Sequence, residues 1–163
     1  KFLLDIAKIL KDKNIDFELH LLGDGDDRPI LEEKTNILEL NERVFFHGNV
    51  TNVEEFLWTY DIYLHSATYE PLGLVLLEAM AAGLPVITLD GRGNRDLIEQ
   101  GKNGFMLFEP NAEEFARKII ELWNDQAKYR EISLYSQDFA GNFDIKEYVD
   151  RLINIYHSTY PNK

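Results

Sequence analysis

Residues 69–85 read Tyr-Glu-Pro-Leu-Gly-Leu-Val-Leu-Leu-Glu-Ala-Met-Ala-Ala-Gly-Leu-Pro, and the rest of the chain is organised around this stretch. The residues from Leu74 to Ala82 are apolar or strong helix formers, which predicts a helix. Gly83 supplies a left-handed cap after the helix, and Pro85 prevents its continuation. A helix that is apolar on every face is typical of a protein interior, so we expect this helix to be buried.

Two carboxylates and a glycine give this helix its chemical character. Glu78 lies within the helix, where a buried ionised carboxylate is costly unless a partner or a ligand compensates. Glu70 precedes the helix, and Gly73 stands at its start, where free backbone N–H groups and the helix dipole favour a bound phosphate. Because carboxylates also accept hydrogen bonds from hydroxyl groups, the stretch offers the groups that a sugar nucleotide requires.

The spacing Glu-x7-Glu from Glu70 to Glu78, within this flanking sequence, resembles the donor-binding signature of the group 1 glycosyltransferases. These are retaining enzymes with the two-domain GT-B fold. Four further segments look like landmarks of the family's C-terminal domain, so that the resemblance covers nearly the whole chain: residues 21–25, 45–50, 92–98 and 101–105. The Gly-Asn-Arg-Asp form of residues 93–96 resembles capsule and exopolysaccharide transferases more than glycogen synthases.

The resemblance implies a role for each residue of the central stretch. Glu70 would be catalytic, facing the donor sugar near its reacting carbon. Gly73 and Leu74 would offer backbone N–H groups to the diphosphate, and Glu78 would accept hydrogen bonds from the ribose hydroxyls. Gly48, Asn49 and Val50 would form the loop that contacts the base, largely through backbone groups.

Two glycine-rich turns supply the remaining candidate donor-binding residues. Gly23 and Asp24 follow an expected strand, where α/β proteins approach ligands with backbone, although a plain turn is the alternative. Arg92 and Asn94 belong to the second turn, and the alternative for Arg92, as for Arg95, is a solvated loop charge.

Composition excludes several other classes of function. The chain has 163 residues, 17 basic and 29 acidic side chains and a formal net charge of −12, which argues against a nucleic-acid partner. It contains no cysteine and no long apolar run, so we expect neither disulfides nor a membrane span, and a cytoplasmic location. No cluster of ligating side chains has metal-binding spacing, and no hydrolase triad is evident, so no cofactor or metal is expected.

Strands and helices alternate along most of the chain. This order predicts an α/β fold, a doubly wound Rossmann-like parallel sheet with helices on both faces, followed by a C-terminal helical extension. We expect residues 1–125 to form the nucleotide-sugar-binding domain and residues 126–163 to form helices that pack on it and toward an N-terminal domain. The expected strands are 17–22, 43–47, 62–65, 85–89 and 104–108, and the expected helices are 2–10, 29–40, 53–60, 74–82, 96–99, 112–123 and those within 126–160.

The chain departs from the family pattern at its beginning. The resemblance implies an Arg and a Lys that clamp the diphosphate after the first strand of this domain, and neither that strand nor the N-terminal acceptor-binding domain is present. We therefore expect a fragment, a GT-B C-terminal domain lacking its first strand. In the usual strand order the absent strand lies in the middle, so its neighbours would expose unpaired backbone groups.

The resulting hypothesis is a donor-binding domain that serves the retaining transfer of a hexose from a nucleoside-diphosphate sugar to an acceptor hydroxyl. The expected acceptor is a sugar or a lipid-linked sugar of surface polysaccharide or glycoconjugate synthesis, with peripheral membrane association arising through the N-terminal domain. A sugar-nucleotide epimerase or phosphorylase of the same architecture, and a non-catalytic flavodoxin-like binding module, are the alternatives. His65 is interpreted as a core or strand-end histidine rather than a catalytic one.

Overall fold

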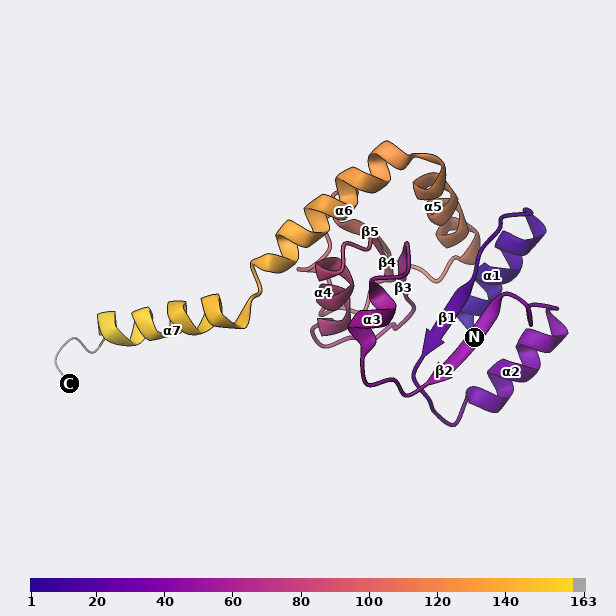
Figure 1. The fold of residues 1–163 in the computed structure, drawn as a ribbon, viewed down its shortest axis with the longest axis horizontal. Coiled ribbons are helices and arrows are strands. Elements are labelled where there is room, and N and C mark those ends of the chain that lie inside the picture. Colours follow the sequence, from indigo (N-terminus) through magenta and orange to yellow (C-terminus); the bar gives the residue numbers. More distant parts are fainter. Residues whose placement is uncertain (160–163) are drawn as a thin grey trace.

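The structure is a computed structural model that describes residues 1–159 (Figure 1). Helices and strands alternate through its first part, and three helices follow the last strand. The strands are β1 (Leu19–Leu22), β2 (Val44–Gly48), β3 (Tyr63–His65), β4 (Val86–Leu89) and β5 (Gly104–Leu107). The helices are α1 (Phe2–Asp12), α2 (Arg28–Ile37), α3 (Val53–Leu57), α4 (Leu74–Ala81), α5 (Ala112–Asn124), α6 (Gln126–Gly141) and α7 (Ile145–Thr159).

The strands form two parallel sheets. β1 pairs with β2, with Leu19 opposite Val44. β4 lies between β3 and β5 and pairs with both, with Ile87 opposite Leu64 and Phe105. No pairing joins the two sheets within residues 1–159, which confirms the expected interruption of the sheet.

The interruption lies on the β1 side of the first sheet and the β3 side of the second. Phe17, just before β1, and Leu64 of β3 pack against the same hydrophobic cluster, and the ring of His20 on β1 lies 4.7 Å from that of Tyr60, just before β3. We call the interval between these two strands the β1–β3 gap.

α1 contributes to the hydrophobic clusters of both sheets. Ile6 and Leu10 are buried in a cluster with residues of β4, β5 and α5, whereas Leu4 and Ala7 are buried in a cluster with Val44 of β2. These four positions recur at helical spacing. The helix therefore packs on two sheets that share no strand pairing.

The C-terminal helices differ in how they contact the domain. The Asn111 side chain accepts a hydrogen bond from the Glu114 N–H at 3.1 Å and so caps the N-terminus of α5. α6 packs against α4 and buries Ile132 and Ala140. α7 buries no residue and projects from the body (Figure 1), so α6 is the helix that packs on the domain as expected, and packing of α7 toward an N-terminal domain stays a prediction. Tyr160, where the expected helical region ends, lies outside the described residues.

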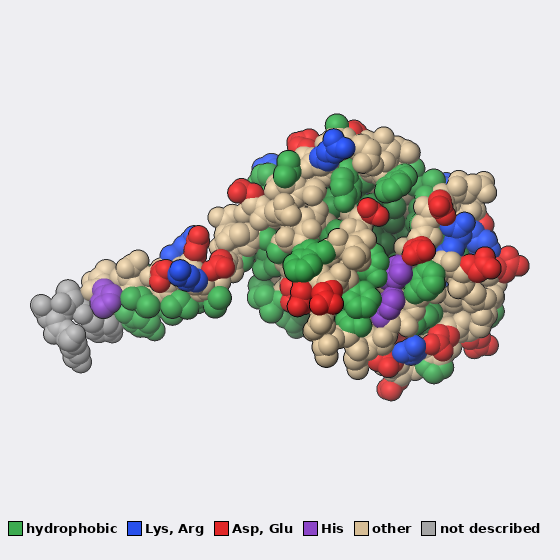
Figure 2. All heavy atoms as spheres, in the orientation of Figure 1, with side chains coloured by type: hydrophobic (Ala, Val, Ile, Leu, Met, Phe, Trp, Pro, Cys, Tyr) green, Lys and Arg blue, Asp and Glu red, His purple; other side chains and the backbone are tan. Residues whose placement is uncertain are grey.

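An apolar stripe runs along the projecting helix α7. Figure 2 shows apolar side chains gathered along one side of α7, with charged side chains on the other. The large apolar residues exposed on α7 are Ile145, Tyr148, Val149, Ile153, Ile155 and Tyr156. Within residues 1–159, no helix combines the length and apolar character needed to cross a bilayer.

One expected helix is absent. Residues 93–97 form turns where a helix was expected over 96–99. The buried Asn103 side chain accepts a hydrogen bond from the Glu99 N–H and donates one to the Leu97 carbonyl, both at 2.8 Å. These side-chain bonds satisfy backbone groups that a helix would use, so they favour the turn.

Candidate functional site

The first group of predicted residues lies where β1 and β2 end. The Gly23 N–H donates to the Gly48 carbonyl at 2.7 Å, so the two loops are joined directly. The Asp24 carboxylate accepts from the Gly25 N–H at 2.9 Å, and Arg28 lies 3.5 Å from its other oxygen. The structure thus brings Gly23, Asp24 and Gly48 together, and the loop residues Asn49 and Val50 follow directly along the chain.

The second group is built around Glu70 and the turn from Gly91 to Gly93. The Glu70 N–H donates to the Gly91 carbonyl at 2.8 Å, and the Gly93 N–H donates to the Glu70 carbonyl at 3.0 Å. A Cβ atom on Gly93 would lie 2.0 Å from the Pro71 carbonyl oxygen, and one on Gly91 would lie 2.7 Å from Glu70 Cβ. The glycines of this turn therefore allow two backbone segments to touch, and this contact sets the position of Glu70.

The Glu70 carboxylate lies at the start of α4. Its Oε1 accepts a hydrogen bond from the Gly73 N–H at 3.0 Å, and Gly73 has a left-handed φ of 87°. A negative charge at this end of a helix is favoured by the dipole. Since the Gly73 N–H is already bonded to Glu70, it does not face a ligand freely. The first-turn N–H groups of Leu74 and Val75 have no partner inside the helix, and the expected contact of the Leu74 N–H with a diphosphate stays a prediction.

α4 is half exposed, contrary to the expectation of a fully buried helix. Leu76 and Met80 are buried, whereas the relative exposure of Leu74 is 60% and Glu78 is also exposed. The described chain covers only the face of α4 that contacts β3, β4 and α6. The Glu78 side chain is therefore exposed and open to a ligand's hydroxyl groups. Gly83 has a φ of 83°, which confirms the predicted left-handed cap.

Tyr63 lies close to both carboxylates of the Glu-x7-Glu pair. Burial raises the pKa of Tyr63 to about 12, and the charges of Glu78 and Glu70 contribute to the increase. Sequence reasoning assigned Tyr63 no role. The alternation of side chains along β3 was the available signal, because it places Tyr63 and His65 on the same face of the strand.

The second glycine-rich turn is internally braced. The Asn94 side chain is fully buried: its Oδ1 accepts from the Gly91 N–H at 2.9 Å, and its Nδ2 donates to the Leu89 carbonyl at 2.9 Å and to Thr88 Oγ1 at 3.0 Å. Asn94 was expected to contact the donor. Its side chain instead holds the turn in place, because all of its polar atoms are bonded inside the protein.

The two arginines of this turn have different environments. Arg95 binds the Asp90 carboxylate with two hydrogen bonds of 2.8 and 2.6 Å, and the Arg92 N–H donates to the same carboxylate at 2.9 Å. The Arg95 guanidinium, followed by the Arg92 N–H, lowers the pKa of Asp90 to about 2. The Arg92 side chain is exposed and forms no ion pair within residues 1–159, so Arg92 is the cation of this turn that can reach an anion.

His65 was interpreted as a strand-end histidine, and the structure places it beside Glu70. His65 Nε2 lies 3.5 Å from Glu70 Oε2, and the His65 side chain is 14% exposed. Burial lowers the pKa of His65, and the neighbouring Glu70 opposes that decrease. The sequence carried little signal for this contact, because the four residues between His65 and Glu70 form a loop of unpredictable course.

A chain of polar contacts next to the first group was also missed. His20 Nδ1 lies 2.8 Å from His47 Nε2, and His20 Nε2 lies 3.0 Å from Glu18 Oε2. The His20 ring also stacks on Phe45, with ring centroids 4.9 Å apart. The contacts form across the paired strands β1 and β2, just before Gly48, and so fix the end of β2 from which the expected base-binding loop begins.

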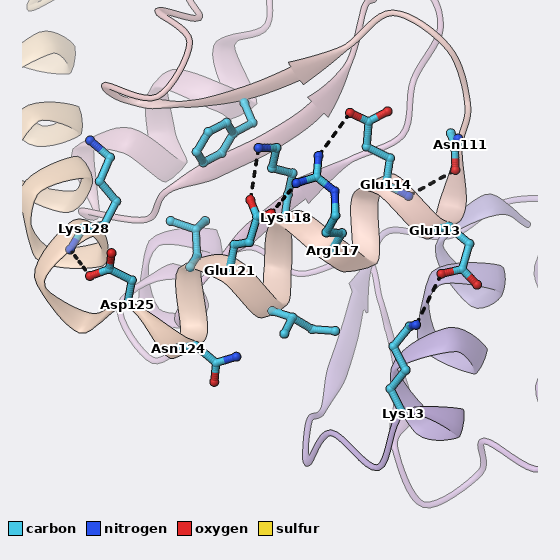
Figure 3. A pocket seen from close by; sticks show the side chains of 13 residues that line it. Lys13, Asn111, Glu113, Glu114, Arg117, Lys118, Glu121, Asn124, Asp125 and Lys128 are labelled. Atoms are coloured by element: carbon cyan, nitrogen blue, oxygen red, sulfur yellow. Dashed lines mark hydrogen bonds and ion pairs between the residues drawn. The ribbon is translucent and has the colours of Figure 1, made fainter.

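A separate groove of about 1000 Å³ runs along α5 (Figure 3). Its charged side chains are paired with one another, as in the contacts of Lys118 with Glu121 at 3.1 Å and of Lys13 with Glu113 at 3.6 Å. None of its lining residues is a candidate site residue. Within residues 1–159, no three His, Cys, Asp or Glu side chains are grouped as a metal site would require.

Comparison with known proteins identifies the family. The family model for glycosyl transferases group 1 matches residues 1–139. The chain belongs to the group 1 glycosyltransferases. This group 1 chain is 30% identical over 156 residues to the putative glycosyltransferase EpsD of Bacillus subtilis, which covers 96% of this chain and 41% of the relative. It is 32% identical over 141 residues to the lipopolysaccharide core biosynthesis glycosyltransferase LpsE of Rhizobium meliloti, and the match covers 86% of this chain and 42% of the relative.

Solved structures of group 1-like proteins show the same fold. HepE of Anabaena, in complex with UDP, superposes with a TM-score of 0.83 at 26% identity, over 94% of this chain and 44% of that one. A glycosyltransferase from Rickettsia africae superposes with a TM-score of 0.85 at 22% identity, over 99% of this chain and 45% of that one. These likenesses confirm the predicted α/β architecture of a GT-B C-terminal domain. The chain spans about two fifths of the length of the curated relatives named above.

Proposed function

We propose that this chain binds the nucleoside-diphosphate sugar of a retaining hexosyltransferase, which transfers the hexose to an acceptor hydroxyl. The observation that carries the proposal is the placement of Glu70 just before α4 and of Glu78 within it. Glu70 is held at the helix start by the Gly73 N–H, while Glu78 is exposed on the same helix. HepE, solved with UDP-glucose at 26% identity, supports this class of donor.

Four candidate residues in and around α4 have a proposed part in binding the donor. Glu78 accepts hydrogen bonds from the ribose hydroxyls, the Leu74 N–H and the Arg92 guanidinium bind the diphosphate, and Glu70 faces the sugar. An exposed arginine suits this role, because negative charge develops on the departing diphosphate.

The loops at the ends of β1 and β2 have proposed parts as well. Gly48, Asn49 and Val50 contact the base through backbone. Gly23 and Asp24 form the adjoining wall of the site, and the Gly23–Gly48 hydrogen bond joins the two loops. A metal ion has no assigned role in this proposal.

The wider setting of the reaction is proposed on the same basis. The acceptor is a sugar or lipid-linked sugar of surface polysaccharide or glycoconjugate synthesis, since named relatives include a lipopolysaccharide core glycosyltransferase. Transfer takes place in the cytoplasm, at the inner face of the membrane, and requires a second domain to close over this one, exclude water and align the acceptor.

Calorimetric titration of the chain with UDP, GDP, ADP and CMP, with and without magnesium, tests donor binding. We expect saturable binding of one nucleotide, and at least a tenfold loss of affinity in Glu78→Gln, because the neutral amide is a weaker acceptor for ribose hydroxyls. Glu33→Gln is the matched control: it removes one exposed helical carboxylate outside the site and should leave affinity unchanged. No binding of any nucleotide at millimolar concentration would contradict the proposal.

A further inference from the structure

His65 has a buried nitrogen without a hydrogen-bond partner. The side-chain Nε2 of His65 is the buried side-chain nitrogen or oxygen within residues 1–159 that lacks such a partner. Buried polar atoms are nearly always bonded, so an exception calls for a specific explanation. The nearest acidic group is the Glu70 carboxylate, whose Oε2 lies 3.5 Å away.

The two oxygens of the Glu70 carboxylate are held unequally. Oε1 is anchored by the Gly73 N–H at 3.0 Å, whereas Oε2 has only the long contact with His65. A carboxylate with one anchored oxygen can turn about that anchor, and a second donor would fix its plane. A distance of 3.5 Å exceeds an ordinary N–H···O bond by about 0.5 Å. Hydrogen bonds in active sites are often long without ligand and tighten when the ligand is bound.

The surroundings of His65 favour a neutral ring. The side chain is 14% exposed and shares its face of β3 with Tyr63, whose ring is stacked at 6.2 Å. Burial, the larger influence, lowers the pKa of His65, although Glu70 acts in the opposite direction. A neutral imidazole carries its proton on one nitrogen, and the proton on Nε2 is the one that a carboxylate oxygen at this position stabilises.

We propose that His65 is a positioning residue, which donates its Nε2–H to Glu70 Oε2 and so orients the Glu70 carboxylate toward the sugar of the bound donor. The proposal rests on the proposed function, because the sugar is what the oriented carboxylate meets. With both oxygens held by N–H donors, the Glu70 carboxylate keeps its remaining lone pairs for the sugar hydroxyls. A neutral donor orients the carboxylate without cancelling its charge. A lysine or arginine at the same place would cancel that charge.

The first test needs no ligand. A long-range proton–nitrogen spectrum of the histidine side chains at pH 7 should show His65 as the Nε2–H tautomer. Its Nε2 resonance should move in Glu70→Gln and stay in place in Glu78→Gln, which serves as the matched control on the same site. The Nδ1–H tautomer, or an Nε2 resonance that is indifferent to Glu70→Gln, overturns the proposal whether or not the chain binds nucleotides.

The second test separates positioning from nucleotide binding. The affinity ratio of UDP-glucose over UDP isolates the contribution of the sugar. We expect His65→Leu to leave UDP affinity within twofold and to lower this ratio at least fivefold. His65→Gln should restore the ratio to within twofold, because its amide N–H can reach the position of Nε2.

The outcomes of the second test are distinguishable. Equal losses in the Leu and Gln variants, or an unchanged ratio in a folded His65→Leu protein, overturn the positioning role while leaving nucleotide binding intact. A wild-type chain that binds none of the four nucleotides of the calorimetric titration overturns the proposed function itself. Where wild-type UDP-glucose and UDP bind equally, the tautomer spectrum alone decides. Thermal unfolding of each variant identifies a protein that has lost its fold.

Discussion

Gly93 determines how closely the second glycine-rich turn approaches Glu70. Its position leaves no space for a side chain, since an added Cβ would lie 2.0 Å from the Pro71 carbonyl oxygen and 2.3 Å from that of Glu70. Both neighbours are backbone atoms, which cannot move aside as a flexible side chain can. The turn and the catalytic candidate are therefore one structural unit.

Gly93→Ala should separate the turn from Glu70 and so weaken both stability and donor binding. Overpacking of this kind costs about 1–3 kcal/mol of unfolding free energy, and we expect nucleotide-sugar affinity to fall more than nucleotide affinity. Denaturant unfolding and calorimetry measure the two effects. Gly25→Ala is the control, because no atom lies within 4 Å of its added Cβ. Equal behaviour of the two variants would show that the contact is not what places Glu70.

Tyr63 predicts a stability change at alkaline pH. Its pKa of about 12 in the folded protein, raised first by burial, exceeds the ordinary value near 10. The neutral ring is favoured by folding, so its contribution is complete below pH 10 and is lost as the pH rises to 12. Two pKa units correspond to about 2–3 kcal/mol.

The measurement is the difference in unfolding free energy between wild type and Tyr63→Phe across this pH range. The wild type should lose stability relative to the variant, which has no hydroxyl to ionise. Tyr148→Phe, at a 61% exposed tyrosine of α7, should run parallel to wild type. Parallel curves for Tyr63→Phe and wild type would mean that Tyr63 ionises freely in the folded protein.

At the residue scale, the local sequence pattern predicted where a residue lies along the fold better than it predicted what surrounds its side chain. The sequence located Glu70 and the left-handed Gly83 correctly, because both depend on neighbours within a few residues. It assigned Glu78 to the interior, which is wrong, and Asn94 to the ligand, whereas the polar atoms of the Asn94 side chain are bonded inside the protein. Whether a helix face is covered, and where an amide side chain finds its partners, depends on tertiary contacts that a helical pattern does not encode.

The free edge of β5 is capped by a side chain. Gln100 Nε2 donates to the Met106 carbonyl at 2.7 Å, and the Met106 N–H donates to Gln100 Oε1 at 2.9 Å. The amide thus makes the two hydrogen bonds that a neighbouring strand would make. Exposed strand edges promote pairing between chains, and a capped edge resists it.

Gln100→Ala should uncap this edge. We expect the Met106 amide to exchange with solvent at least tenfold faster, and light scattering of concentrated protein to increase, because the backbone pair is left for another chain. Gln126→Ala, at a glutamine bonded only to the Trp123 carbonyl, is the matched control. Unchanged exchange at Met106 would show that the strand, and not the Gln100 amide, protects it.

At the scale of helices and strands, the sequence predicted nearly every element. Local pattern sufficed for α1 and α5, which were expected over residues 2–10 and 112–123. The helix expected over 96–99 failed because Asn103, several residues away, binds the backbone of Leu97 and Glu99. The exposure of α7 was also unpredictable, since its pattern states which face is apolar and not what covers it.

For the whole molecule, the β1–β3 gap predicts that one more strand pairs between the two sheets. Backbone groups alternate between the two sides of a strand. The Leu19 N–H donates to Arg43 on the β2 side, and the Tyr63 N–H donates to Pro85 on the β4 side. The N–H groups of His20 and Leu64 therefore point into the gap.

Hydrogen exchange of single amides tests this prediction. In the 163-residue chain, His20 and Leu64 should exchange much faster than Leu19 and Tyr63. They should become protected in any state of the protein in which an additional strand pairs between β1 and β3. Slow exchange of His20 and Leu64 in the present chain would mean that the gap is already closed in solution, as by another copy of the chain.

The placement of α1 on both sheets has a consequence for how the molecule unfolds. Its buried residues belong to the hydrophobic clusters of both halves, so neither half can open without withdrawing packing from the helix that also stabilises the other. The two sheets then behave as one cooperative folding unit despite sharing no backbone pairing. A nucleotide that contacts the loops of both halves would in this way protect the two sheets together from local unfolding.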